Sequence, residues 1–235
     1  LQVMQNLPIT VRNVAALLHD SVDGAPLQED VQAVVDDMLK EPIVPLMEKD
    51  DRLQFISERM TEIDQERAQL PLRNAETRRI LNEALRECFD PLPSAQVEGV
   101  LAVKTGLKVL GSGYPTSLAG EREPIQTLIE LADAGELDTA RKRLEDQSRE
   151  SASSRSIFLL AQTAAESEER IQEIYRCRGI AEKYRNDPDQ EIRDYCQSQA
   201  DRAARLSQQL VQLLKRTLTK GELFFRGRVS AVESL

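Results

Sequence analysis

The segment TVRNVAALLHDSVDGAPLQEDVQAVVDDMLKE, residues 10–41, decides the fold expected for the start of the chain. Its apolar residues recur at helical spacing in two runs, Thr10–Val22 and Leu27–Glu41, on either side of the turn sequence DGAP. Thr10 is a good N-cap for the first helix, and Pro42 ends the second. We therefore expect a helix-turn-helix here.

The residues that follow predict a β-hairpin. Between Ile43 and Ser57, apolar and polar side chains alternate on both sides of a charged turn, residues 48–51. Two helices followed by such a hairpin have the order of a winged helix-turn-helix. Residues 1–57 are therefore predicted to form a winged-helix-like domain, and in a DNA-binding protein of that class the second helix enters the major groove.

The second helix carries the wrong charge for that role. Residues 27–41 hold a single Lys40 against five carboxylates, on Glu29, Asp30, Asp36, Asp37 and Glu41. DNA phosphates repel such a surface. The hairpin turn EKDD is acidic too. If the protein contacts DNA, we expect that it does not do so through the helix 27–41.

The net charge of −9 is unevenly distributed over the 235 residues. Residues 1–60 hold 11 acidic and 5 basic side chains, and residues 61–168 hold 19 and 13. Residues 169–235 hold 10 acidic and 13 basic side chains, so only the end of the chain has a basic excess. This excess is well short of the composition of a strongly basic nucleic-acid-binding domain.

Cysteine usage and hydropathy predict a cytoplasmic protein without membrane contact. Cys88, Cys177 and Cys196 have no C-x-x-C spacing, which indicates reduced thiols, and Cys88 and Cys177 are expected to be buried structural thiols in helices. No run approaches the roughly 18 apolar residues that span a bilayer, and there is no signal-peptide pattern. The chain begins at Leu1 in what reads as the tail of a helix and stops at VSAVESL, so we expect a piece of a longer protein.

Residues 58–90 are predicted to form a helical connector, and residues 91–235 an α+β domain with a mixed or antiparallel sheet. The connector consists of a charged helix, a break at Pro71 and a second helix with an apolar stripe. The sequence DPLPS, residues 90–94, marks the boundary. The expected fold class of the whole chain is α+β and predominantly helical.

The α+β domain is expected to follow a β-β-β-α-β-α-α-β order. Thr105-Gly106 is predicted to be a hairpin turn, the stretch 111–123 a loop, and Asp189 the N-cap of the last long helix. The predicted strands cover residues 95–104, 107–111, 124–132, 155–163 and 221–229, and the predicted helices 135–150, 166–184 and 190–218. In the last strand, Gly227 is expected to permit a bulge or to end the strand.

The sequence offers no catalytic, cofactor-binding or metal-ligating residue. His19 is the only histidine, so neither a histidine-based metal cluster nor a nucleophile–histidine pair is expected, and an exposed or capping role is favoured. The loop GSGYPTSLAG lacks the spacing and the lysine of a phosphate-binding loop. Most carboxylates fall on polar helix faces or in turns, where a catalytic pair cannot be distinguished.

The segment RIQEIYRCRGIAEKYR, residues 170–185, is the best positive cluster. We predict that it joins later basic residues in a face that contacts phosphates or a protein partner. The residues of this predicted face are Arg176, Lys183, Arg185, Arg202, Arg205, Arg226 and Arg228. The alternative, which the available counter-charges favour, is a solvated face whose charges pair with Glu182, Asp194 and Asp201.

Several segments together resemble one protein family. The segments are DRLQFISE, ETRRILNEALRECFDPLPS, TGLKV, AGEREPIQTLIELAD, SSRSIFLLAQT, RIQEIYRCRGIAEKYRND, YCQSQADRA and GELFFRGR. They are similar to the region downstream of the ATPase module in the large P-loop proteins of BREX bacteriophage-exclusion systems, the BrxC/PglY family. The resemblance covers nearly the whole chain and rests on a pattern of segments rather than on a catalytic signature.

The resemblance implies a bacterial, cytoplasmic protein of antiviral defence that binds and hydrolyses ATP, with magnesium. It implies partners among the other BREX components, including a methyltransferase and an alkaline-phosphatase-like protein. No nucleotide-binding residue carries over, because the chain has neither a Walker A loop nor a convincing Walker B strand, so the P-loop would lie upstream of Leu1. The expected function is that of a non-catalytic interaction fragment that contacts BREX components, another copy of itself or DNA.

Two other functions remain open at this point. The first is a winged-helix DNA-binding transcriptional regulator with a helical dimerisation segment, which needs a face other than the helix 27–41 for DNA. The second is a hydrolase or transferase, for which the sequence supplies no supporting constellation of residues.

Overall fold

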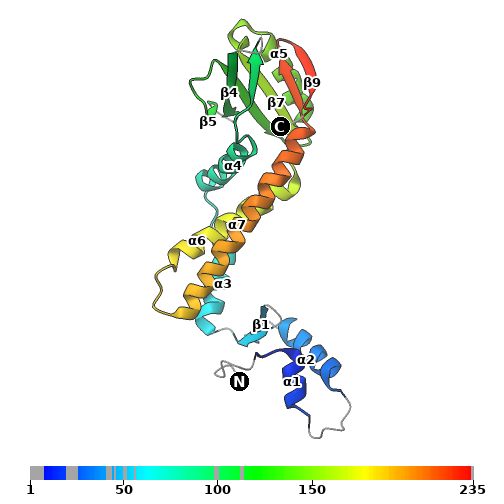
Figure 1. The fold of residues 1–235 in the computed structure, drawn as a ribbon, viewed down its shortest axis with the longest axis vertical. Coiled ribbons are helices and arrows are strands. Elements are labelled where there is room, and N and C mark those ends of the chain that lie inside the picture. Colours follow the sequence, from blue (N-terminus) through cyan, green and yellow to red (C-terminus); the bar gives the residue numbers. More distant parts are fainter. Residues whose placement is uncertain are drawn as a thin grey trace. The chain divides into compact units, whose positions relative to one another are not determined.

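The structure is a computed structural model that describes residues 8–19, 26–40, 44, 46–49, 52–55, 57–97, 101–111 and 114–233 (Figure 1). The chain divides into two compact units, Leu1–Gln69 and Leu70–Leu235. The fold is α+β and largely helical, with a mixed sheet in the second unit, which confirms the predicted class.

The first unit holds two short helices, a β-hairpin and a charged helix. Their bounds are α1 (Val11–Leu17), α2 (Gln28–Lys40), β1 (Leu46–Lys49), β2 (Arg52–Phe55) and α3 (Glu58–Gln69). Thr10 caps α1 as predicted, because its hydroxyl accepts from the Asn13 amide at 3.1 Å. One small core joins α1, α2 and the hairpin, and its buried members are Val11, Ala15, Val31, Val35 and Leu53.

The order of these elements is the one predicted, and α2 falls within one residue of its expected bounds. The expectation that the first helix runs to Val22 is wrong, because α1 ends at Leu17 and Leu18 already forms a turn. Residues 20–25, 41–43 and 50–51, which hold most of the DGAP turn and part of the acidic EKDD turn, lie outside the described residues. The assignment to the winged-helix class stays a prediction.

The second unit is built on a mixed sheet whose described strands follow the order β3-β4-β6-β7-β8-β9, with β5 also paired to β4. Strands β4, β6 and β7 are mutually parallel, and the remaining pairs are antiparallel. The bounds are β3 (Ser94–Val97), β4 (Leu101–Val109), β5 (Thr116–Ala119), β6 (Ile125–Ala132), β7 (Ser156–Gln162), β8 (Glu222–Phe225) and β9 (Arg228–Ala231).

Alternation along β6 and β7 sends apolar side chains to both faces of the sheet, so each face needs helices to cover it. On one face α5 (Leu137–Arg149) buries Leu144 against Phe158, Leu160 and Phe224. On the other face α4 (Asn74–Cys88) and the end of α7 (Gln190–Thr219) cover Leu107, Ile129 and Leu159.

The remaining helix, α6 (Ala165–Lys183), pairs with α7 across a short turn. The carboxyl-terminal half of α7 packs on the sheet, while its amino-terminal half runs beyond the sheet beside α6 (Figure 1). Asp189 caps α7 as predicted, accepting from the Glu191 amide at 2.9 Å. Residues 58–90, the expected connector, are divided between the units: α3 belongs to the first, and α4 packs in the core of the second.

The hairpin predicted at Thr105-Gly106 is wrong. Both residues lie inside the continuous strand β4, and the antiparallel pair is β3–β4, whose turn residues 98–100 lie outside the described residues. A glycine is needed at position 106 for another reason. A Cβ there would lie 2.2 Å from the Gly120 carbonyl oxygen and 2.4 Å from the side-chain nitrogen Nε2 of Gln126. Close approach of neighbouring groups, and not a turn, requires the glycine.

Two further predictions in this unit are corrected. The stretch 111–123 was expected to be a loop, but it contains β5, which pairs with β4. The expected last strand 221–229 is a hairpin of β8 and β9, with Arg226 and Gly227 as its turn. Both turn residues have positive φ, 51° and 74°, as a tight two-residue hairpin turn requires, so Gly227 makes neither a bulge nor a strand end.

Candidate functional site

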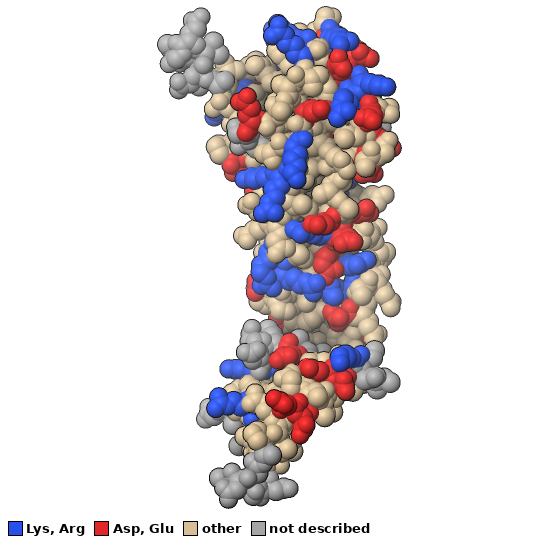
Figure 2. Space-filling model, turned by 90° about the vertical axis from the view of Figure 1, so that its right-hand side faces the viewer, with Lys and Arg blue, Asp and Glu red and all other residues tan. Residues whose placement is uncertain are grey.

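The seven residues predicted to form one basic face lie at separate places in the second unit. Arg176 and Lys183 are on α6, and Arg185 is in the turn that follows it. Arg202 and Arg205 are on α7, and Arg226 and Arg228 are on the β8–β9 hairpin. Figure 1 shows that hairpin and the turn between α6 and α7 at opposite ends of the unit. Figure 2 shows Lys and Arg interspersed with Asp and Glu on the face that it presents, not one continuous basic surface.

Several of these charges already have neighbours. Arg202 Nη2 lies 2.9 Å from Glu173 Oε1 and so joins α7 to α6, and Arg185 is 3.9 Å from Glu182. The Lys183 ammonium lies 4.9 Å from the Tyr184 ring centroid, and the Arg226 guanidinium 5.2 Å from that of Phe225. Pairing of this kind is what the alternative of a solvated helix face predicts, although the partners differ in part from those expected.

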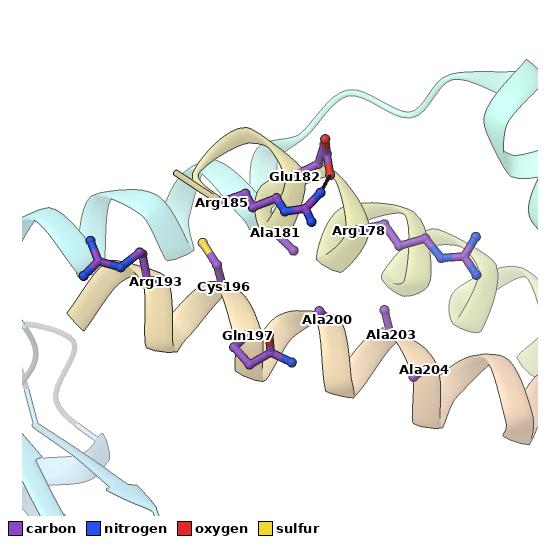
Figure 3. Close-up of a pocket in the computed structure, with 10 residues that line it drawn as sticks. All are labelled: Arg178, Ala181, Glu182, Arg185, Arg193, Cys196, Gln197, Ala200, Ala203 and Ala204. Atoms are coloured by element: carbon purple, nitrogen blue, oxygen red, sulfur yellow. Dashed lines mark ion pairs between the residues drawn. The ribbon is translucent and has the colours of Figure 1, made fainter. Parts of the chain in front are cut away.

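A groove of about 580 Å³ lies between α6 and α7 near the turn that joins them (Figure 3). Two kinds of side chain line it, charged or polar groups and small residues. We call it the arginine groove; it is lined by Arg178, Ala181, Glu182, Arg185, Arg193, Cys196, Gln197, Ala200, Ala203 and Ala204. Three arginines face one glutamate, so the lining carries an excess of two positive charges.

The floor of the arginine groove is made of small side chains. Ala200 and Ala204, one helical turn apart on α7, are exposed, whereas Ala203 and Cys196 are buried. Burial raises the pKa of the Cys196 thiol, and the negative charge of Asp187 acts in the same direction. The thiol is therefore neutral at physiological pH, and the floor is uncharged.

Arg178 is held by two other helices. Its Nη1 lies 2.9 Å from Glu83 Oε2 on α4, and its Nη2 donates to Ser207 Oγ on α7 at 3.3 Å. Burial acts to raise the pKa of Glu83, but the ion pairs with Arg178 and Arg79 outweigh it and hold this pKa below its ordinary value. Arg178 therefore lines the groove in a fixed position.

Arg193 is likewise fixed, because it ties the start of α7 to the α6–α7 turn. Its Nη1 donates to the carbonyl oxygens of Asp187 and Pro188 at 2.6 and 2.8 Å, and its Nη2 donates to Gln190 Oε1. Arg185 differs, since its ion pair with Glu182 is long and 73% of its side chain is exposed. Arg185 is thus the groove arginine most available to a bound partner.

Of the predicted residues, only Arg185 lines this groove. Arg178, Arg193 and the alanines were not among the predicted residues. The missed signal is a repeated spacing of polar or small residues at intervals of three and four. It occurs at Arg178, Glu182 and Arg185, which stands just past the end of α6, and again on α7 at Arg193, Gln197, Ala200 and Ala204.

Two other hollows in the unit have a more balanced lining. Arg205 lies in one of about 880 Å³, where glutamines and two glutamates, Glu87 and Glu166, accompany three arginines. The other, of about 530 Å³, lies beside the end of β7, where Glu166 and Glu222 accompany Arg141, Arg216 and Lys220. Neither combines a small-residue floor with an excess of two charges of one sign.

The buried thiols match their predicted structural role. Cys88 and Cys177 are buried, and burial raises the pKa of Cys88 to about 11, so this thiol is protonated at neutral pH. Among the residues that the structure describes, no three His, Cys, Asp or Glu side chains are grouped so that they could hold a metal ion. Within the same residues, no helix is both long and apolar enough to cross a membrane.

No protein-family model, curated protein or solved structure matches the chain. The resemblance to the BREX proteins therefore stays a prediction from the sequence segments alone.

Proposed function

We propose that this chain is a non-catalytic interaction module whose arginine groove binds an acidic, amphipathic helical segment of a partner protein. The observation that carries the proposal is the combination of three arginines with an uncharged floor of small residues. An amphipathic helix lays its apolar side into such a groove, and carboxylates beside that apolar stripe meet the guanidinium groups.

The groove supports a protein partner better than duplex DNA. Its arginines lie within a short hollow, and two of the three are fixed by contacts with Glu83, Ser207 and the α6–α7 turn. The other predicted basic residues lie elsewhere in the unit, so they do not extend the groove along a phosphate backbone. The acidic face of α2 repels phosphates as well.

For the whole protein we propose a BREX-type P-loop ATPase of antiviral defence, acting in the bacterial cytoplasm with the other BREX components. The support is the set of sequence segments that resemble the BrxC/PglY family. ATP and magnesium would then bind upstream of Leu1, and this chain would supply contacts rather than chemistry. Reading the coding sequence upstream of Leu1 tests this proposal, because it requires a Walker A motif there.

Binding to two labelled probes tests the function of the groove. The first probe is a synthetic amphipathic helical peptide with glutamates beside an apolar stripe, and the second is a DNA duplex. We expect the peptide to bind, and Arg185→Glu to weaken its binding about tenfold, because a close charge pair turns into a repulsive one. Fluorescence anisotropy at two salt concentrations measures both probes.

Arg228→Glu is the matched control, because Arg228 is an exposed arginine on β9, away from the groove. It should leave peptide binding unchanged. Equal loss in both variants would mean that only net charge matters, and the proposal would be wrong. Tight DNA binding with a steep salt dependence, without peptide binding, would favour the DNA-binding regulator instead.

A further inference from the structure

An amphipathic helix with the required chemistry is present in the first unit of this chain. On α2, Val31 and Val35 are buried in the core of the first unit, while Val34 and Met38 remain 56% and 43% exposed. Asp30 and Asp37 are exposed as well. At one hundred degrees per residue, Asp30, Val34, Asp37 and Met38 share one helix face, since they stand at i, i+4, i+7 and i+8.

The length of this face matches that of the groove floor. Asp30 and Asp37 are seven residues apart on α2, which corresponds to a rise of about 10.5 Å. Gln197 and Ala204, which line the groove, are likewise seven residues apart on α7. A helix lying along α7 can therefore place its carboxylates beside the groove arginines, while Val34 and Met38 cover the alanine floor.

The charge of the two units favours the same contact. The first unit holds 14 acidic and 6 basic side chains, and the second holds 26 and 25, so nearly all of the net charge of −9 lies in the first. The groove in turn carries an excess of positive charge. Attraction of this kind raises association rates and favours the complementary pairing over others.

We propose that the arginine groove binds the Asp30–Met38 face of α2 from a second copy of the chain. This inference rests on the proposed function and names the occupant of the groove. The contact joins two different surfaces, so it is heterologous: each bound pair leaves one free α2 face and one free groove. Chains then add head to tail, and assembly continues with concentration unless a ring closes.

Sedimentation velocity of the full chain over a concentration series tests the proposal. We expect the mass to rise with concentration and the association to weaken in high salt. Asp37→Lys and Arg185→Glu should each weaken association about tenfold, because each replaces an attractive pair by a repulsive one. Asp36→Lys is the matched control: Asp36 is an exposed neighbour on α2 that accepts from Gln32 and lies off the proposed face.

Mixing two variants gives the sharpest test. A chain with Asp30→Lys and Asp37→Lys keeps an intact groove, and a chain with Arg185→Glu keeps an intact α2 face. Each alone should be largely monomeric, but their mixture should form dimers that do not grow further, since only one interface remains. A mixture that stays monomeric, or association that ignores Arg185→Glu, overturns the inference. Circular dichroism of each variant confirms that the helices are intact.

The two proposals fail in different ways. If the chain stays monomeric at every concentration while the acidic peptide still binds in a manner that depends on Arg185, the groove is an interaction site and the second copy is the wrong occupant. If the peptide does not bind and the chain associates independently of Arg185, both proposals are wrong.

Discussion

The two halves of α7 differ in what they contact and in what they can do. The carboxyl-terminal half buries Leu210, Leu214 and Leu218 against the sheet. The amino-terminal half packs on α6 and leaves Ala200 and Ala204 exposed beside charged side chains. One helix thus runs from the stable core of the unit to its candidate binding groove, so a rigid element positions the groove.

This difference predicts where a substitution should lower the stability of the fold and where it should weaken binding. Truncating a large apolar side chain near the sheet leaves a cavity, whereas a charge substituted in the groove stays in contact with water. The four tyrosines, Tyr114, Tyr175, Tyr184 and Tyr195, all lie in the second unit, and the chain has no tryptophan. Tyrosine fluorescence during denaturant unfolding therefore reports on this unit alone.

The largest expected effect comes from the sheet end. Phe158→Ala removes a side chain that is 1% exposed in the α5 core, and we expect the free energy of unfolding to fall by about 3–5 kcal/mol. Phe225→Ala is the matched control at the end of β8, beside the hairpin turn, where the side chain is 39% exposed, and its cost should be below about 1 kcal/mol. Equal losses in both variants would contradict the distinction between buried and exposed positions.

A smaller effect is expected at Gly106. Because a Cβ would meet the Gly120 carbonyl oxygen, Gly106→Ala should lower the free energy of unfolding by about 1–3 kcal/mol. Gly111→Ala is the control, since nothing lies within 4 Å of a Cβ there. If Gly106 had no close neighbours, its replacement by alanine would raise the free energy of unfolding by about 0.5–1 kcal/mol, as is typical of a glycine inside a strand. A gain at Gly106 would therefore contradict the close approach.

The smallest effect is expected where the groove meets α4. Glu83→Gln removes the ion pairs with Arg178 and Arg79, and all three side chains are substantially exposed, so the loss at neutral pH should be below about 1 kcal/mol. The folded state lowers the pKa of Glu83, so this contribution is present above the ordinary carboxyl pKa of about 4.3 and disappears as the pH falls through the lower folded-state value.

Unfolding of this variant and the wild type between acidic and neutral pH checks that sign. The two stabilities should converge in acid and separate towards neutrality. A difference that grows in acid would contradict the lowered pKa.

The helices and strands with clear periodicity were predictable from the sequence. Helix α6 begins and ends within one residue of its expected bounds, and the caps at Thr10 and Asp189 are the predicted ones. Apolar spacing and capping are local properties, so a single sequence can reveal them. The connection between β3 and β5 was mispredicted, because Gly106 serves a contact with residues further along the chain.

The candidate site was predictable only in part, for a related reason. Composition identified the basic segment 170–185, but not which of its arginines share a surface with α7. Arg178 reaches Glu83 on α4, and the alanines of the floor carry no chemical signal of their own. Their significance arises only when two helices lie side by side.

Because all three native thiols are buried, the occupancy of the groove can be measured with a single introduced cysteine. Cys88, Cys177 and Cys196 are buried, and burial raises the pKa values of Cys88 and Cys196, so alkylating reagents should modify them slowly in the folded chain. A cysteine introduced by Ala204→Cys would stand exposed on the floor and react first. Its alkylation rate would then measure the occupancy of the groove in any mixture, without a label on the partner.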